Sequence, residues 1–381
     1  MKQSSAWILF GVLAALGCGE DDSGSDESST TLPNNPAPSG AMSADPSAMM
    51  PAATPPATPA AMMPVAMMPV AMPPAAMPPA TDTTATGIPG VVAEGAVVQV
   101  LGEGFQGTEG PLGLPDGSFI FTETNANRIT RIDPNDELST FLENTNGSNG
   151  LGFDATGRLI SVQTTPGMTR IGVIYPAGSE AVLSDNYDGK PFGRPNDLVV
   201  STTGAVYFSE PGPNAPADGS TPPPPPLTAA VYHIPVGGSA QRVAEGIERP
   251  NGIMLSRDEE TLYVNNTQGE YLLAFDVGAD GSLSNRRDFA EYDGVTTAAN
   301  GAFASGADGL AIDSEGRLYV ATTVGVQVFS EDGERLGTIP VSRAPQNIAF
   351  AGPNKQTLYI VGRGAAYKVT TLARGFADRA K

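Results

Sequence analysis

Two stretches of the chain, NGLGFDATGRLISVQ at residues 149–163 and DGLAIDSEGRLYVAT at residues 308–322, share one layout. Each opens on a polar residue followed by glycine, continues with a short apolar run, passes through D-x-x-G-R-L and ends in a second apolar run. Short apolar runs separated by turn residues predict two β-strands joined by a tight turn. The shared layout therefore predicts the same strand pair in two distant parts of the chain.

The same layout occurs six times in all, and two of the further copies follow the tripeptide Arg-Pro-Asn, at RPNDLVV and RPNGIML. Neighbouring copies are 39 to 57 residues apart, and they begin at Glu109, Asn149, Asn196, Asn251, Asp308 and Asn347. Each interval leaves room for two more strands, and a unit of about 40–45 residues with four strands is typical of a propeller blade. A single blade cannot bury both faces of its sheet, so the blades must stack around an axis.

We therefore predict an all-β fold, a six-bladed β-propeller. A β-sandwich is the alternative, but it does not explain why one motif returns at the spacing of blades. Radial repetition brings the first residue of every copy toward one axis. The six opening residues are consequently expected at the mouth of one channel.

The opening residues supply only oxygen ligands, from two carboxylates and up to four amides. Taken singly, Asn or Asp before Gly is typical of a turn, because these residues tolerate unusual backbone angles. Glu109 has no such preference. Hard oxygen donors gathered at one point suit a divalent cation, with Ca²⁺ as the expected ion and manganese, magnesium or zinc as alternatives.

The composition excludes several other kinds of site. With one His and one Cys in 381 residues, a histidine-rich metal site is impossible, and a Ser-His-acid triad would have to use His233. His233 lies within AAVYHIPVGG, which predicts an ordinary strand residue. The net charge of −20 disfavours nucleic acid and anionic membranes as partners. Enzyme chemistry in this chain would therefore depend on a hard cation and carboxylates.

Five motifs resemble, in order and spacing, those of the SMP-30/gluconolactonase family. They are EGP at 109–111, SNGLGFDATGRLI at 148–160, RPNDLVVSTTGAVYFSEPG at 194–212, RPNGIMLSRDEETLYVNN at 249–266 and DGLAIDSEGRLYVAT at 308–322. The resemblance covers about residues 95–370. It implies a six-bladed propeller with a divalent metal, often calcium, in its central channel, and hydrolysis of sugar lactones; some relatives cleave phosphotriesters.

Matched motif by motif, the resemblance implies a metal site formed by Glu109, Asn196, Asn251 and Asp308. Asp308 would also act as the catalytic base, and Arg194 would hold the substrate. We assign Asn149, from the same ring, to substrate binding as well. One departure concerns SVQTTPGMTR at 161–170, where many bacterial members have a Cys-Glu-His stretch. This departure and the proline-rich insertion at 216–226, which we expect at the channel rim, put gluconolactone itself in doubt as the substrate.

The sequence therefore predicts a metal-dependent hydrolase that opens a small-molecule sugar lactone or a similar ester. The alternative is a non-enzymatic, surface-tethered binding or scaffold propeller with a structural calcium ion, because fold alone does not give function. Phosphotriesterase-like chemistry shares the fold and stays open. Strictosidine-synthase-like chemistry works without a metal, so the four predicted ligands argue against it.

The N-terminal third of the chain predicts export. Residues 1–18 resemble a bacterial lipoprotein signal that ends at Cys18, the expected lipidation site, with a plain signal peptide as the alternative. Residues 19–88 are acidic and then rich in Pro, Ala and Met, which predicts a disordered tether; copper binding by its Met residues is the alternative. The propeller is expected at 89–375. The protein would be lipid-anchored to a bacterial membrane, most simply the outer membrane on its periplasmic or outer side, with no other membrane contact.

Overall fold

The computed structural model describes residues 77–213, 225, 227–297, 301–379 and 381. The predicted signal with Cys18, most of the predicted tether, and the insertion at 216–226 apart from Pro225 lie outside the described residues. The described residues contain no helix with the length and apolar character that a bilayer crossing needs.

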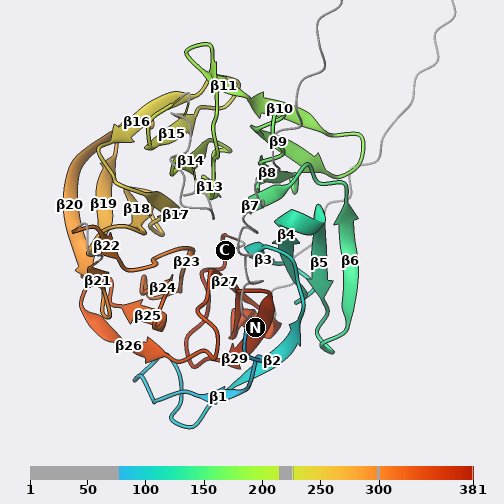
Figure 1. The fold of residues 1–381 in the computed structure, drawn as a ribbon, viewed down its shortest axis with the longest axis vertical. Coiled ribbons are helices and arrows are strands. Elements are labelled where there is room, and N and C mark those ends of the chain that lie inside the picture. Colours follow the sequence, from blue (N-terminus) through green and yellow to red (C-terminus); the bar gives the residue numbers. More distant parts are fainter. Residues whose placement is uncertain (1–76, 214–224, 226, 298–300, 380) are drawn as a thin grey trace, which may run out of the picture. The chain divides into compact units, whose positions relative to one another are not determined.

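Six antiparallel sheets in the described residues stand around one axis, as Figure 1 shows, which confirms the predicted all-β, six-bladed propeller. The first blade comprises β3 (Thr108–Gly113), β4 (Phe119–Glu123), β5 (Arg128–Ile132) and β6 (Leu138–Glu143). The second comprises β7 (Ser148–Phe153), β8 (Leu159–Gln163), β9 (Arg170–Tyr175) and β10 (Ala181–Ser184). The third comprises β13 (Leu198–Val200), β14 (Val206–Glu210), β15 (Ala230–Ile234) and β16 (Gln241–Glu245).

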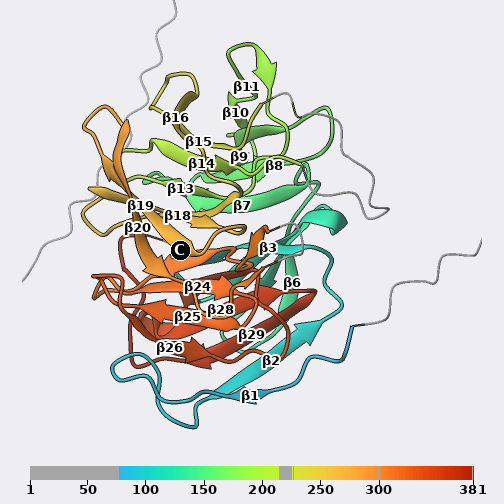
Figure 2. The same cartoon turned by 60° about the vertical axis from the view of Figure 1, so that its left-hand side comes forward.

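The remaining blades follow the same order, with the first strand of each nearest the axis (Figure 1). The fourth comprises β17 (Pro250–Leu255), β18 (Thr261–Asn266), β19 (Tyr271–Val277) and β20 (Leu283–Glu291). The fifth comprises β23 (Leu310–Ile312), β24 (Leu318–Thr322), β25 (Gly325–Phe329) and β26 (Arg335–Ile339), three of which lie side by side in Figure 2. The sixth begins with β27 (Asn347–Ala351), β28 (Thr357–Gly362) and β29 (Ala365–Thr370).

Strands from both ends of the domain close the ring. In the sixth blade, β29 pairs with β2 (Val97–Glu103), and β2 pairs with β1 (Thr83–Thr84). Ala85 and Ile88 are buried in the hydrophobic cluster that the fifth and sixth blades share. The folded unit therefore begins before residue 89, where the sequence predicts the end of the tether. Two small hairpins and two 3₁₀ turns complete the described elements: β11 (Asn186–Tyr187) with β12 (Lys190–Pro191), β21 (Thr296–Thr297) with β22 (Phe303–Ala304), η1 (Thr124–Ala126) and η2 (Pro353–Lys355).

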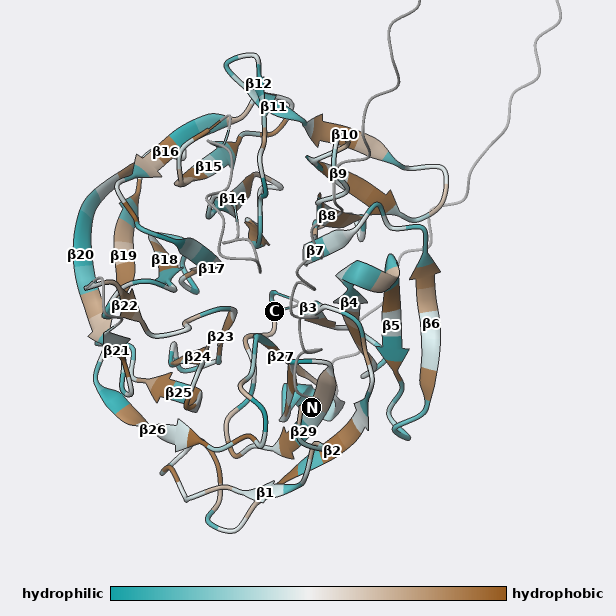
Figure 3. Cartoon of the chain, in the orientation of Figure 1, coloured by the Kyte–Doolittle hydropathy of each residue, from teal (hydrophilic) through white to brown (hydrophobic). Residues whose placement is uncertain are grey.

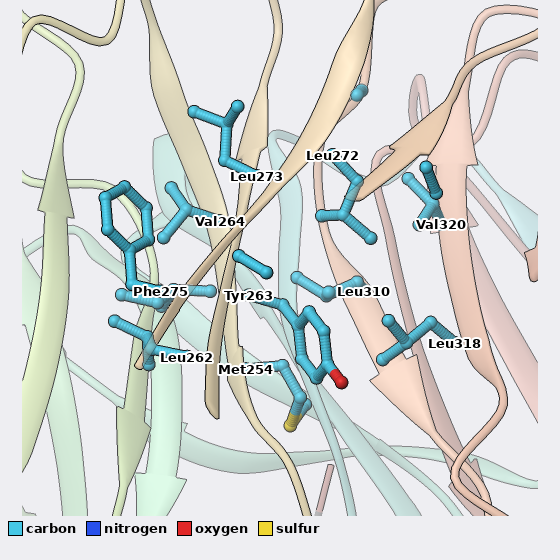
Figure 4. Close-up of a cluster of buried hydrophobic side chains, with 14 of the residues drawn as sticks. Met254, Leu262, Tyr263, Val264, Leu272, Leu273, Phe275, Leu310, Leu318 and Val320 are labelled. Atoms are coloured by element: carbon cyan, nitrogen blue, oxygen red, sulfur yellow. The ribbon is translucent and has the colours of Figure 1, made fainter. Parts of the chain in front are cut away.

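The hydrophobic core lies between neighbouring blades. Between the fourth and fifth blades, Leu310, Leu318 and Val320 belong to the same buried cluster as Met254 and Leu262 (Figure 4). The outermost strand β20 is largely hydrophilic in Figure 3, and its residues 284–288 are exposed. Burying apolar faces between blades while exposing the outer strands is what stabilises a radial array of sheets.

Candidate metal centre and active site

The six opening residues of the repeated motif lie at one end of the six innermost strands. Four of them lie within β3, β7, β17 and β27, and the other two lie two residues before β13 and β23: Glu109, Asn149, Asn251, Asn347, Asn196 and Asp308. None of the Asn and Asp residues has a positive φ. The ordinary explanation of Asn-Gly and Asp-Gly as left-handed turn residues is therefore wrong for these positions.

Close packing of neighbouring blades explains the glycines that follow. A Cβ on Gly110 would lie 2.1 Å from the carbonyl oxygen of Asn149 in the next blade, and a Cβ on Gly252 would lie 2.1 Å from that of Asp308. The amide of Gly252 donates to the Asp308 carbonyl oxygen at 3.0 Å. Only glycine permits this approach of two backbones. The motif thus brings each opening residue close to its neighbour around the axis.

Hydrogen bonds between blades connect members of the ring directly. Asn149 Nδ2 donates to the carbonyl oxygen of Asn196 at 3.1 Å, which joins the second blade to the third. Asn347 Nδ2 donates to Glu109 Oε2 at 3.1 Å, which joins the sixth blade to the first. With the contact between Gly252 and Asp308, these bonds connect the six opening residues in three neighbouring pairs.

Three of the four predicted metal ligands present an unsatisfied oxygen. Oδ1 of Asn196, of Asn251 and of Asp308 is buried and has no hydrogen-bond partner among the described residues. Asn251 uses its Nδ2 to donate to Thr267 Oγ1 at 3.1 Å, which leaves the oxygen as the free end of the amide. A buried polar atom without a partner costs about 1–3 kcal/mol, so a cation or water bound between these three oxygens would be stabilised.

The two carboxylates destabilise each other in the absence of a cation. Burial raises the pKa of Glu109 to about 7; the hydrogen bond from Asn347 opposes this shift, and the charge of Asp197 adds to it. Burial, followed by the charges of Glu109 and Asp197, raises the pKa of Asp308 well above its usual range. A divalent cation would favour both ionised carboxylates.

The donor set fits a hard cation. Among the described residues, no three His, Cys, Asp or Glu side chains form a metal-binding group, so a site here must combine two carboxylates with amide oxygens. Carboxylate and amide oxygens are typical ligands of Ca²⁺, whereas imidazole and thiolate are preferred by zinc. Glu109, Asn196, Asn251 and Asp308 are the residues that would hold the cation, and their roles stay predictions.

Arg194 lies beside the ring. It lines a cavity of about 890 Å³ together with Met168, Arg170 and Phe192. Its Nη1 is buried and has no hydrogen-bond partner among the described residues. Its backbone N–H donates to Glu210 Oε1 at 2.8 Å. Substrate binding by Arg194 stays a prediction.

Asn149 has a different environment from the predicted ligands. Its Oδ1 accepts a hydrogen bond from Thr124 Oγ1 at 3.2 Å, while its Nδ2 bonds to the third blade. Both ends of the amide thus hold blades together, and substrate binding by Asn149 stays a prediction. His233 is a buried residue of β15 stacked on Tyr207 at 4.5 Å, as an ordinary strand residue would be.

Sequence reasoning missed two buried acidic residues, one beside the ring and one beside Arg194. Asp197 follows Asn196 at the position where four of the other copies have glycine, so the sequence carried a visible signal. Glu210 accepts from the backbone N–H groups of Gly193 and Arg194, and burial raises its pKa to about 6. The charge of Asp197 acts on Glu109 and Asp308, whereas Glu210 fixes the backbone of Arg194.

A six-bladed propeller with an oxygen-rich ring at its channel mouth defines the class of protein. Residues 107–363 match the model of the SMP-30/Gluconolactonase/LRE-like region. The chain belongs to this family.

Individual relatives resemble the chain over most of their lengths. A gluconolactonase of Zymomonas mobilis is 28 % identical over 312 residues, which is 73 % of this chain and 82 % of that protein. The structure of a gluconolactonase from Xanthomonas campestris superposes with a TM-score of 0.64 at 28 % identity, covering 77 % of this chain and 99 % of the other. Regucalcin of Agrobacterium tumefaciens, described as a calcium-binding protein, shares the fold with a TM-score of 0.59 at 17 % identity, covering 74 % and 96 %.

Proposed function

We propose that this protein is a lactone hydrolase that uses a divalent cation, with calcium as the expected ion, bound by Glu109, Asn196, Asn251 and Asp308. The observation that carries the proposal is the trio of buried, unpartnered oxygens of Asn196, Asn251 and Asp308 beside a second buried carboxylate. The gluconolactonases of Zymomonas mobilis and Xanthomonas campestris support lactones as the substrate class. The regucalcin named as calcium-binding supports the choice of ion.

The reaction needs water, a base and charge stabilisation. When bound, the cation supplies Lewis acidity that polarises the lactone carbonyl. The carboxylate of Asp308 accepts a proton from the attacking water as the water oxygen forms a bond to the carbonyl carbon. The ring C–O bond then breaks, and a proton from the site passes to the departing ring oxygen, giving a hydroxy acid.

Arg194 would orient the substrate. Arg194 lines a cavity of about 890 Å³, and its buried Nη1 has no partner among the described residues, so it would donate to a lactone oxygen in the proposed complex. Its backbone is fixed by the hydrogen bond to Glu210. A planar donor on an anchored backbone restricts how a small ring can lie, and such positioning can contribute substantially to the rate.

The first experiment replaces Asp308 with Asn and measures lactone hydrolysis by proton release, with calcium or with a chelator. We expect the wild type to lose activity in chelator and Asp308→Asn to lose about 10²–10⁴-fold in kcat with calcium present. Calcium binding is measured separately by calorimetry. Wild-type turnover by Asp308→Asn with calcium bound would remove the base from the mechanism. A panel of lactones and aryl esters that all stay uncleaved, with calcium raising only the Tm, would support the scaffold alternative.

We also propose that Cys18 is the lipidation site and that residues 1–18 are a lipoprotein signal. The support is the sequence alone, since these residues lie outside the described part of the chain. Metabolic labelling with a radioactive fatty acid tests this proposal, and Cys18→Ser should abolish the label. A labelled Cys18→Ser protein would reject it.

A further inference from the structure

We propose that the lactone substrate carries a hydrocarbon substituent, and that the cavity of about 890 Å³ lined by Arg194 binds this group. The inference deepens the proposed function and rests on it for the reaction, although binding of a hydrocarbon group can be measured without any turnover. An alkyl-substituted lactone differs from a sugar lactone, whose ring carries several hydroxyl groups. The two classes of substrate therefore need different cavity walls.

Two segments that line this cavity lead to the ring of opening residues. Arg194 lines the cavity and precedes Asn196, with its unpartnered Oδ1, by two residues. Thr164 of the second blade also lines the cavity, and its Oγ1 donates to the carbonyl oxygen of Gly147 at 2.8 Å. Gly147 in turn precedes Asn149 by two residues. The cavity therefore lies at the end of the second and third blades where the opening residues are.

Apolar residues from the second blade, the β11–β12 hairpin and the third blade line much of the cavity. These residues are Pro166, Met168, Pro191, Phe192 and Pro213. Phe192 is anchored by edge-to-face packing on Phe208, with the ring centroids 5.0 Å apart. Cavities of about 300–1,000 Å³ with mainly apolar walls are typical of sites for drug-sized ligands. The cavity thus has room for a substituent beyond one small lactone ring.

A tight turn holds Met168 at the cavity wall. In Thr165-Pro166-Gly167-Met168, the backbone N–H of Met168 donates to the carbonyl oxygen of Thr165 at 2.9 Å, and Gly167 has a φ of 80°. Pro followed by a glycine with positive φ is typical of a type II turn. The carbonyl oxygen of Met168 also accepts from Asn146 Nδ2 at 3.0 Å. The Met168 side chain is nonetheless 54 % exposed. A flexible apolar side chain on a fixed backbone, beside other apolar residues of a cavity, favours an apolar ligand.

Three polar side chains of the cavity wall already form hydrogen bonds within the protein. Besides Thr164, Arg170 Nε donates to Gln163 Oε1 at 2.8 Å, and Asp185 Oδ1 accepts from Asn186 Nδ2 at 2.7 Å. A polyhydroxylated substituent would have to compete for these groups or leave its own hydroxyl groups without partners, which is costly when they are buried. A hydrocarbon substituent needs no such partners and is stabilised by leaving water.

The kinetic test compares three lactones with the same six-membered ring: δ-decalactone, which carries a pentyl chain, unsubstituted δ-valerolactone, and hydroxylated gluconolactone. Burial of one methylene group strengthens binding by about fourfold. After correction for spontaneous hydrolysis, we therefore expect kcat/KM for δ-decalactone to exceed that for each of the other two by tenfold or more. A kcat/KM for δ-decalactone no higher than that for either comparison lactone would overturn the inference.

The variant test assigns the preference to the cavity wall. Met168→Gln keeps the length of the side chain but makes its end polar, and it should reduce the ratio of kcat/KM for δ-decalactone to that for δ-valerolactone by fivefold or more. Met168→Leu should retain most of the ratio. Met77→Gln is the matched control, since Met77 is also 54 % exposed but lies ahead of β1 and does not line this cavity. An unchanged ratio in Met168→Gln would overturn the inference.

A binding measurement separates this inference from the proposed function. Calorimetry compares 2-pentyltetrahydropyran with tetrahydropyran, two cyclic ethers that match the rings of δ-decalactone and δ-valerolactone but contain no ester bond. The wild type should bind the pentyl compound at least tenfold more tightly, and Met168→Gln should lose much of this difference. A protein that cleaves no lactone but shows the difference would reject the lactonase and retain the hydrocarbon site. Equal binding of both ethers, with turnover intact, would reject the hydrocarbon site and retain the lactonase.

Discussion

The two ends of the central channel differ in how their polar groups are paired. At the end where the innermost strands begin, Asn196, Asn251 and Asp308 present buried oxygens without partners. At the other end, the last described segment supplies partners: Arg379 pairs with Glu259 at 3.0 Å and donates to the carbonyl oxygen of Leu255 at 2.7 Å. Unpaired polar groups lower stability and bind ligands, whereas paired groups stabilise the fold.

The contact between Lys381 and Asp197 joins the two ends. The C-terminal end of the described chain lies near the centre of the ring in Figure 1, where Lys381 Nζ forms an ion pair with an Asp197 carboxylate oxygen. These side chains are only 3 % and 1 % exposed. Asp197 adjoins the predicted ligand Asn196. The C-terminal segment at the far end of the channel therefore also neutralises a carboxylate next to the predicted metal site. Lys381 thus links the packing of the C-terminal segment to the charge at the predicted metal site.

The largest expected effect comes from breaking this link. Lys381→Met leaves the carboxylate of Asp197 buried without its partner, and we expect the free energy of unfolding in chelator to fall by about 3–5 kcal/mol. Calcium affinity should not fall, because a positive charge near the cation has been removed. Urea unfolding and calorimetry measure the two quantities.

A surface ion pair and a double variant serve as controls. Lys368→Met removes the ion pair with Asp136, which is partly exposed, and should cost about 0–1 kcal/mol. Adding Asp197→Asn to Lys381→Met should restore much of the lost stability, because the uncompensated charge is gone. If the single variant at position 381 cost no more than the control at position 368, Lys381 would not stabilise the channel.

Glu109→Gln, at the predicted metal site, should lower calcium affinity but raise stability in chelator. The isosteric amide can still accept the hydrogen bond from Asn347, but it removes one of two buried like charges. We expect calcium affinity to fall by about 100-fold, which corresponds to about 2.7 kcal/mol, while the Tm in chelator rises. A variant with lower Tm and unchanged calcium affinity would show that Glu109 has a structural role.

The fold could be predicted because the signal is repeated and local. Each copy of the motif specifies a strand pair, and six copies at blade spacing leave few arrangements other than a ring. The four predicted ligands followed from the same repetition and from the resemblance to the family. The reason for the glycines was not predictable in the same way, because it depends on the carbonyl oxygen of the neighbouring blade approaching Gly110 and Gly252.

Other features depend on contacts that leave no local pattern. The pairing of Lys381 with Asp197 spans 184 residues of sequence, and nothing near Lys381 indicates a buried partner. β1 lies in a Thr- and Pro-containing stretch that resembles the preceding tether in composition, although Ala85 and Ile88 are buried against the fifth and sixth blades. In both cases a segment at the edge of the described region is ordered by contacts with the completed ring.

The smallest expected effect is a pH dependence of stability that comes from the carboxylates at the predicted metal site. Burial raises the pKa of Glu109 to about 7, so the folded protein holds this proton more tightly than the unfolded chain does. The stability that Glu109 contributes in chelator is therefore fully present below about pH 4.5 and is lost as the pH rises through about 7. Asp308, whose pKa is also raised, acts in the same direction.

Calcium should reverse this loss of stability at higher pH, because the bound ion requires ionised carboxylates. The increase in Tm on adding calcium should therefore grow between pH 5 and pH 8. Scanning calorimetry of the wild type and of Glu109→Gln, each with calcium and with chelator, measures the effect. The comparison with Glu109→Gln removes the contribution of general repulsion in a chain with a net charge of −20. Identical pH profiles for the two proteins in chelator would mean that Glu109 is ionised throughout this range. In that case, only the amide oxygens and Asp308 would account for the unpaired polar groups at the predicted metal site.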